Sequence, residues 1–223
     1  MERLLIIAAA SWLAGITAFI GGVLAKLEGS AETKAKRELI HGIMAFGGGI
    51  LVAAVAFVLA PAGVSDLSPV TLAVTFCAGG VLFCGVDAAI SRKRGSKAQF
   101  MAMLLDFVPE AMALGALFAH SEKTGMLLAL FIGAHNLPEG FNAHRENTAN
   151  GTAARASLIT LLAISVLGPV SACSGYLFLR DHLTLTACIM SAAAGGILYV
   201  PGGRRAGCSN RFFTGYAGTE NDT

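Results

Sequence analysis

Residues 135–140 read HNLPEG and stand inside an apolar stretch long enough to form a helix. Residues 106–110, in the preceding apolar stretch, read DFVPE. Both motifs follow one pattern: a polar residue of the kind that ligates metals, two spacers, proline and glutamate. Because a charged side chain is costly at the depth of a bilayer, ionisable residues inside an apolar segment indicate a functional site. Two such motifs on neighbouring segments predict a cation site inside a membrane helix bundle.

The composition is that of a membrane protein. Hydrophobic residues make up 55% of the 223 residues and charged residues only 13%, whereas soluble domains are about a quarter charged. No basic stripe with interleaved aromatic residues is present, so we expect no nucleic-acid partner. The five cysteines form no CxxC motif and indicate small apolar residues rather than a disulfide framework. We therefore expect a multi-pass protein of the plasma or inner membrane, with the lipid bilayer as a partner.

Seven apolar segments approach the roughly 20 residues that a bilayer-spanning helix needs. None contains lysine or arginine, and short polar loops separate them. The predicted fold class is all-α, a polytopic membrane helix bundle of about seven transmembrane helices in one domain, residues 1–200. Residues 201–223 are polar, glycine-rich and without periodicity, which predicts a disordered tail. The segments are 4–25, 39–60, 70–90, 98–119, 125–143, 156–179 and 183–200.

The basic residues predict the orientation, because cytoplasmic loops of membrane proteins carry an excess of lysine and arginine. The loops after the first, third and fifth segments, together with the tail, hold 13 of the 16 basic residues. The opposite side holds Arg3, Lys123 and Arg180. This distribution places the amino terminus outside.

The acids and the histidine of the two motifs are spaced to share helix faces. Residues i and i+4 lie on one face of a helix, so Asp106 pairs with Glu110 and His135 with Glu139. If the two segments pack antiparallel, three carboxylates and one imidazole surround a single point. Each central acid costs about 2.5–3.5 kcal/mol, so three unpaired acids cost on the order of 8–10 kcal/mol. A coordinated divalent ion offsets much of that cost.

The prolines of the motifs add a second feature. Pro109 and Pro138 each remove a helical hydrogen bond and free the carbonyls of Leu105 and Ala134. Freed carbonyls at membrane depth are tolerated where they line a cavity or meet an ion. We expect both prolines to act as hinges beside the ligands.

The donor types predict which metal is bound. Imidazole and carboxylate together suit zinc, and also iron(II), manganese(II) or cadmium(II). The motifs contain no thiolate, which argues against a copper(I) carrier.

Structural roles that do not involve a metal ion remain alternatives for the polar residues. A buried acid in a membrane protein can form a helix–helix hydrogen bond instead of binding an ion. We expect an interfacial position for His41 and an interfacial ion pair for Asp87. His120, Glu122 and His144 are expected to be solvated loop residues, with transient contact to an ion on its path as the alternative.

At these motifs the chain resembles the ZIP (Zrt/Irt-like) family of divalent metal transporters. The resemblance rests on HNLPEG at 135–140, DFVPEAMALGA at 106–116 and AAAGGILYV at 192–200. It implies an eight-helix membrane fold, usually dimeric, that moves zinc or related ions toward the cytoplasm through helices four and five. No eighth apolar run follows residue 200, so we expect a chain that lacks the last helix of the family.

Carried over residue by residue, the resemblance implies a first metal site formed by Asp106, Glu110, His135 and Glu139. Aspartate at 106 stands where the family often has histidine, and an acid can still ligate.

A second metal site is implied only in part. It would use Asn136 with the two glutamates, and also the position of Phe107, whose side chain cannot coordinate. Gly168 stands before Pro169, where an acid of the family often lies. We therefore expect one bound ion rather than two.

The predicted function is transport of divalent metal ions, with zinc as the transported substrate, and not an enzymatic activity. One alternative is a chain that binds metal without moving it. Another is an intramembrane metalloenzyme, which typically carries HExxH on a helix, whereas this chain has HxxxE. A proton- or sodium-coupled carrier of an organic cation is a third alternative.

The orientation generates a direct test. A cysteine introduced by Ser96→Cys in a cysteine-free background should react with a membrane-impermeant reagent only after the cytoplasmic side is exposed. Labelling of that cysteine from the outside of intact cells would show that the orientation is reversed.

Overall fold

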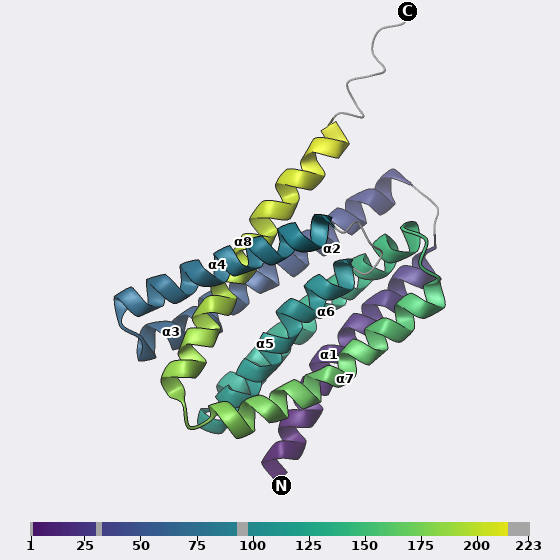
Figure 1. Cartoon of the computed structure of the whole chain (residues 1–223). Coiled ribbons are helices and arrows are strands. Elements are labelled where there is room, and N and C mark those ends of the chain that lie inside the picture. The colour runs from purple at the N-terminus through teal and green to yellow at the C-terminus, as the bar shows by residue number, and fades with distance from the viewer. Residues whose placement is uncertain (1, 30–32, 93–97, 214–223) are drawn as a thin grey trace, which may run out of the picture.

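The computed structural model describes residues 2–29, 33–92 and 98–213, and these residues form helices and turns without a strand (Figure 1). The all-α prediction is confirmed. The basic loop at 93–97, which contains Ser96, lies outside the described residues. The elements are α1 (Glu2–Glu28), α2 (Lys34–Ala54), the π-helical turn η1 (Val55–Leu59), α3 (Ala60–Asp66), α4 (Pro69–Arg92), α5 (Ala98–His120), α6 (Glu122–Ala149), α7 (Ala154–Leu179) and α8 (Leu183–Phe213).

Each of the seven predicted apolar segments lies within one helical rod. The second segment, 39–60, runs through α2, η1 and the start of α3, which follow one another without a break. The wider π turn comes just before Pro61, which has no N–H to donate to the helix.

Among the described residues, five helices are long and apolar enough to cross a membrane by length and composition. The spans are Glu2–Glu28, Lys34–Asp66, Pro69–Val86, Met103–His120 and Ala154–Leu179, and Leu183–Tyr199 is a shorter apolar helix. Helix α6, which carries HNLPEG, is not among the five.

Local sequence signals set the helix ends around the motifs. Ser121 caps α6 by accepting the N–H of Thr124 at 3.2 Å, and Thr33 caps α2 by accepting the N–H of Lys36 at 3.3 Å. Gly151 follows α6 with a positive φ of 88°, a conformation that glycine adopts without strain. The single residue between α5 and α6 makes these two helices antiparallel neighbours.

Helix α1 is central to the packing of the helices around the two motifs. It packs along both α6 and α7, and α5 packs against α7 and α6 (Figure 1). Helix α4 pairs with α8, and this pair contacts the rest of the bundle mainly through α5, α3 and η1. The two motif helices, α5 and α6, are therefore positioned by α1 and α7.

Reciprocal glycines bring paired helices into backbone contact, as expected for small residues in membrane bundles. On α1, Gly21 lies against the carbonyl of Leu137, and on α6, Gly140 lies against the carbonyl of Ala18. A Cβ at either glycine would overlap the opposite backbone. The same arrangement joins α5 to α7 through Gly115 with Ala172 and Gly175 with Met112, and α4 to α8 through Gly79 with Ala192 and Gly195 with Phe76.

The carboxyl-terminal helix is longer than the predicted apolar segment. Helix α8 continues to Phe213, so residues 201–213 of the expected disordered tail are helical in the structure. Residues 214–223 lie outside the described residues.

The glycine contact at Gly140 predicts a stability effect. Gly140→Ala should destabilise the protein by about 1–3 kcal/mol, because the methyl group meets the backbone of α1 and the helices must separate. Thermal unfolding in detergent measures this loss. The matched control is Gly49→Ala on α2, where an added Cβ meets nothing within 4 Å and improves helix propensity. Equal unfolding temperatures for the two variants would show that the α1–α6 contact is not tight.

Candidate metal site

Two of the predicted ligands meet in the interior of the bundle. The Nε2 atom of His135 on α6 lies 3.2 Å from Oε2 of Glu110 on α5, and the side chains are 1% and 2% exposed. Each residue comes from a different motif. The antiparallel packing of α5 and α6 thus brings the two motifs into contact, as the sequence predicts.

The hydrogen bonds of His135 define which nitrogen faces the acid. Nδ1 lies 2.9 Å from the carbonyl oxygen of Phe131, one turn earlier in α6. A carbonyl oxygen only accepts, so Nδ1 donates and Nε2 is the nitrogen that faces Glu110. Neither Nε2 nor Oε2 of Glu110 has a hydrogen-bond partner of good geometry among the described residues. Two electron-rich atoms in this position require a cation, either a proton or a metal ion, between them.

The separation of these two atoms is close to that of two ligands on one ion. Zinc binds imidazole nitrogen and carboxylate oxygen at about 2.0–2.2 Å in tetrahedral sites, so two such ligands lie roughly 3.3–3.5 Å apart. The observed 3.2 Å is slightly shorter than this range. The two side chains would therefore need only a small outward shift to share an ion.

Asn136, which follows His135 in α6, carries another buried acceptor. Its Nδ2 donates to the carbonyl of Ala14 on α1 at 3.1 Å, and the side chain is 1% exposed. This bond fixes the amide and leaves Oδ1 buried without a hydrogen-bond partner in the described part of the chain. A buried amide oxygen without a partner costs free energy and suits a cation.

The other two predicted ligands lie one turn away from the pair. Asp106 is buried and Glu139 is partly buried, and both interact with other groups of the protein. Glu139 acts electrostatically on His135 together with Glu110. Because α5 and α6 are antiparallel, Asp106 and Glu139 lie on the same side of the Glu110–His135 contact.

The predicted four-ligand cluster is therefore not assembled as a whole. Within the ranges that the structure describes, no three His, Cys, Asp or Glu side chains are grouped closely enough to hold one metal ion. The geometry brings together one carboxylate and one imidazole, whereas Asp106 and Glu139 lie one turn away on their helices.

The two motif prolines occupy continuous helices. Pro109 lies inside α5 and Pro138 inside α6. Pro138 is buried, and its Cγ lies 2.7 Å from where a Cβ at Gly47 of α2 would stand. The proline of HNLPEG therefore packs against α2 through a glycine.

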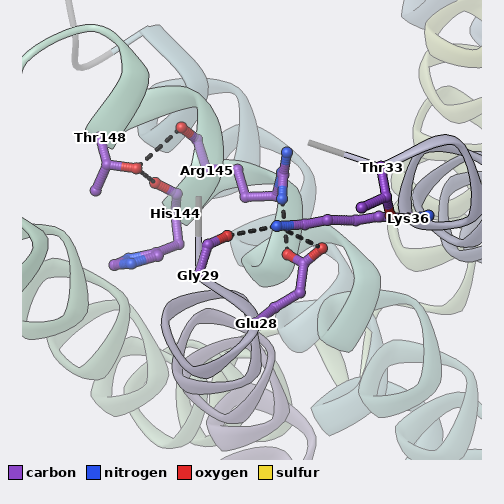
Figure 2. Close-up of polar contacts among 7 residues, drawn as sticks. All are labelled: Glu28, Gly29, Thr33, Lys36, His144, Arg145 and Thr148. Carbon is purple, nitrogen blue, oxygen red and sulfur yellow. Dashed lines mark hydrogen bonds and ion pairs between the residues drawn. The ribbon is translucent and has the colours of Figure 1, made fainter. Parts of the chain in front are cut away.

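A second polar cluster holds the far end of α6 (Figure 2). Glu28, at the end of α1, binds Nη1 of Arg145 on α6 at 2.7 Å and Nζ of Lys36 on α2 at 3.3 Å. The same Nζ donates to the carbonyl of Gly29 at 2.6 Å. One carboxylate therefore ties three helices together on the side where α6 ends. In the sequence, Glu28, Lys36 and Arg145 lie between the predicted apolar segments. Their spacing does not predict the ion pairs that join them.

His144 differs from its expected position. It is 3% exposed, and its Nδ1 lies 3.1 Å from Oγ of Ser157 on α7. The prediction of a solvated loop residue is wrong for His144, because α6 continues past it to Ala149 and α7 packs on it. His120, Glu122 and His41 are exposed, whereas the side chain of Asp87 lies outside the described ones.

No model of a known protein family matches the chain, and a comparison with curated proteins finds no match.

The Glu28 cluster predicts a measurable contribution to stability. Glu28→Gln should lower the free energy of unfolding by about 1–2 kcal/mol, because Arg145 and Lys36 lose their partly buried partner. Chemical denaturation in detergent measures this change, and added salt should shrink it. Glu38→Gln, at an exposed position on α2, is the matched control. A Glu28 variant as stable as this control would show that the cluster does not hold the helices.

Proposed function

We propose that this chain is a membrane-embedded carrier of divalent metal ions, zinc first among them, with the ion held between α5 and α6. The observation that supports this most directly is the buried contact between Glu110 and His135. Among the described residues, neither Nε2 of His135 nor Oε2 of Glu110 has a hydrogen bond of good geometry, and few buried polar atoms in protein interiors are left so. A bound divalent cation would be coordinated by both atoms.

Location in a membrane rests on the apolar helices and on the outer surface. In the described ranges of the chain, five helices have the length and composition to cross a bilayer. Large apolar side chains on the outside are widely exposed, for example Phe57 at 70%, Val81 at 72% and Phe178 at 72%. We propose that α6 and α8 cross as well, because α6 packs along α1 and α8 packs along α4. The Glu110–His135 contact would then lie inside the bilayer.

The chemistry of the donors supports the choice of ion. Imidazole with carboxylate and amide oxygens suits zinc and neighbouring transition metals better than calcium or magnesium. Asp106 and Glu139, on one side of the pair, would take part as the ion arrives or leaves, with Pro109 and Pro138 as hinges. Acidic pH should weaken binding, because these ligands must be deprotonated to coordinate.

The resemblance to ZIP transporters gives the same proposal from the sequence motifs. It adds the direction of transport, toward the cytoplasm, and an association of two chains. Two residues of the motifs on which the resemblance rests, Glu110 and His135, meet in the bundle.

Flux and binding measured on the same preparations test the proposal. Proteoliposomes containing the native chain should take up zinc, and Glu110→Ala or Glu139→Ala should lower both uptake and zinc affinity at least about tenfold. Glu146→Ala, an exposed acid on α6, serves as the control and should match the native chain. Zinc binding without uptake would favour a non-transporting metal-binding protein. Uptake that survives the loss of Glu110 and Glu139 would contradict the assigned site.

A further inference from the structure

Lys36 is the side chain that joins the start of α2 to the end of α1. Its Nζ lies 3.3 Å from Oε1 of Glu28 and donates to the carbonyl of Gly29 at 2.6 Å (Figure 2). Within the described residues, helices α1 and α2 both pack on α6 but do not pack against each other. The reach of Lys36 to Glu28 and Gly29 therefore crosses a gap between two helices.

The two oxygens of Glu28 are held differently. Oε2 accepts a hydrogen bond from Nη1 of Arg145 on α6 at 2.7 Å. Oε1, which faces Lys36, is buried and has no hydrogen bond of good geometry in the described part of the chain. Helices α1 and α6 also touch at the backbone through Gly21 and Gly140. The join between α1 and α6 is therefore extensive, whereas the join between α1 and α2 depends on the Lys36 side chain.

Helix α2 follows α6 from the metal-site motif to the end of that helix. A Cβ at Gly47 of α2 would stand 2.7 Å from Cγ of Pro138, the residue before Glu139. Arg145 lies further along α6, about 9 Å beyond Glu139 at the rise of a helix. The stretch of α6 between the motif and the Glu28 cluster thus has α2 beside it.

We propose that Lys36 and Glu28 form the inner gate of the carrier: their contact holds α2 against α1 and α6, and it separates when an ion passes from the Glu110–His135 pair to the end of α6. The inference rests on the proposed function. It adds which contact opens and which helix moves. The end of α6 lies on the predicted cytoplasmic side, so this gate faces the cytoplasm.

The packing of the bundle is the reason that α2 is the helix that moves. The Glu110–His135 pair is almost inaccessible to solvent, so an ion leaves it only when a neighbouring helix shifts. The glycine contacts join α1 to α6 and α5 to α7 at the backbone, and separating those helices would break their packing. The side chains of Lys36 and Glu28 are 12% and 17% exposed. An ion pair that water reaches in part can hold a helix end and still break during each transport cycle.

A reversible cross-link between the two positions tests the gate. Glu28→Cys and Lys36→Cys are introduced together into a cysteine-free chain that retains zinc uptake, and the protein is reconstituted in liposomes. A short bifunctional methanethiosulfonate reagent joins the two thiols, and a reductant releases them. The cross-link should lower the rate of zinc uptake at least about tenfold, because α2 can no longer leave α1. Reductant should restore uptake, and zinc affinity should stay unchanged throughout because the ligands are intact.

The matched control places both cysteines on α2. Lys34→Cys with Glu38→Cys puts two thiols one turn apart at exposed positions, where the same reagent bridges them without tying α2 to α1. Chains with Glu28→Cys alone or Lys36→Cys alone control for modification of each thiol. All three should keep their rate of uptake after treatment.

The outcomes separate the gate from the transport function. Uptake that continues at the untreated rate in fully cross-linked chains would overturn the gate and leave the metal site in place. Uptake already absent from the double-cysteine chain before treatment would also overturn it, because a chain with an unlatched gate should still pass ions. A loss of zinc affinity equal to the loss of uptake would point to damage at the site and contradict the gate. No zinc uptake by the native chain would overturn the proposed function, and this inference with it.

Discussion

The contact between Glu110 and His135 is the constraint on which the candidate site depends. The two facing atoms lie 3.2 Å apart, are nearly inaccessible to solvent and have no hydrogen bond of good geometry within the part of the chain that the structure describes. Electrostatics in an interior of low dielectric makes such a contact unfavourable unless positive charge lies between the atoms. The hydrogen bond from Nδ1 to Phe131 keeps Nε2 turned toward the acid. Either a proton, which makes the contact a buried ion pair, or a metal ion satisfies this requirement.

The helices around this contact approach one another through glycine. Gly21 and Gly140 bring α1 and α6 together at the backbone, and Gly115 and Gly175 do the same for α5 and α7. Helices that touch at the backbone have little freedom to rotate or slide. This fixes which side chains of α5 and α6 face each other. The ion pairs of Glu28 then hold the end of α6 against α1 and α2.

The sequence predicts the helical rods and the two motifs, and it leaves the details of the contact undetermined. Long apolar runs bounded by polar loops mark each rod, and the i, i+4 spacing places Asp106 with Glu110 and His135 with Glu139. Which of the four meet depends on the rotation and axial shift of α5 against α6. That shift follows from packing at residues far apart in the chain. The burial of His144 has the same origin, because it depends on where α7 begins beyond the turn at Gly151.

X-ray absorption of the zinc-loaded protein is the most direct measurement of the central claim. With one zinc per chain, the first shell should contain an imidazole nitrogen and carboxylate oxygen at about 2.0–2.2 Å. The imidazole contribution should disappear in His135→Ala and persist in the variant of the exposed histidine, His120→Ala. A first shell of water oxygen alone, or an imidazole signal unaffected by the loss of His135, would contradict the claim that this pair holds the ion.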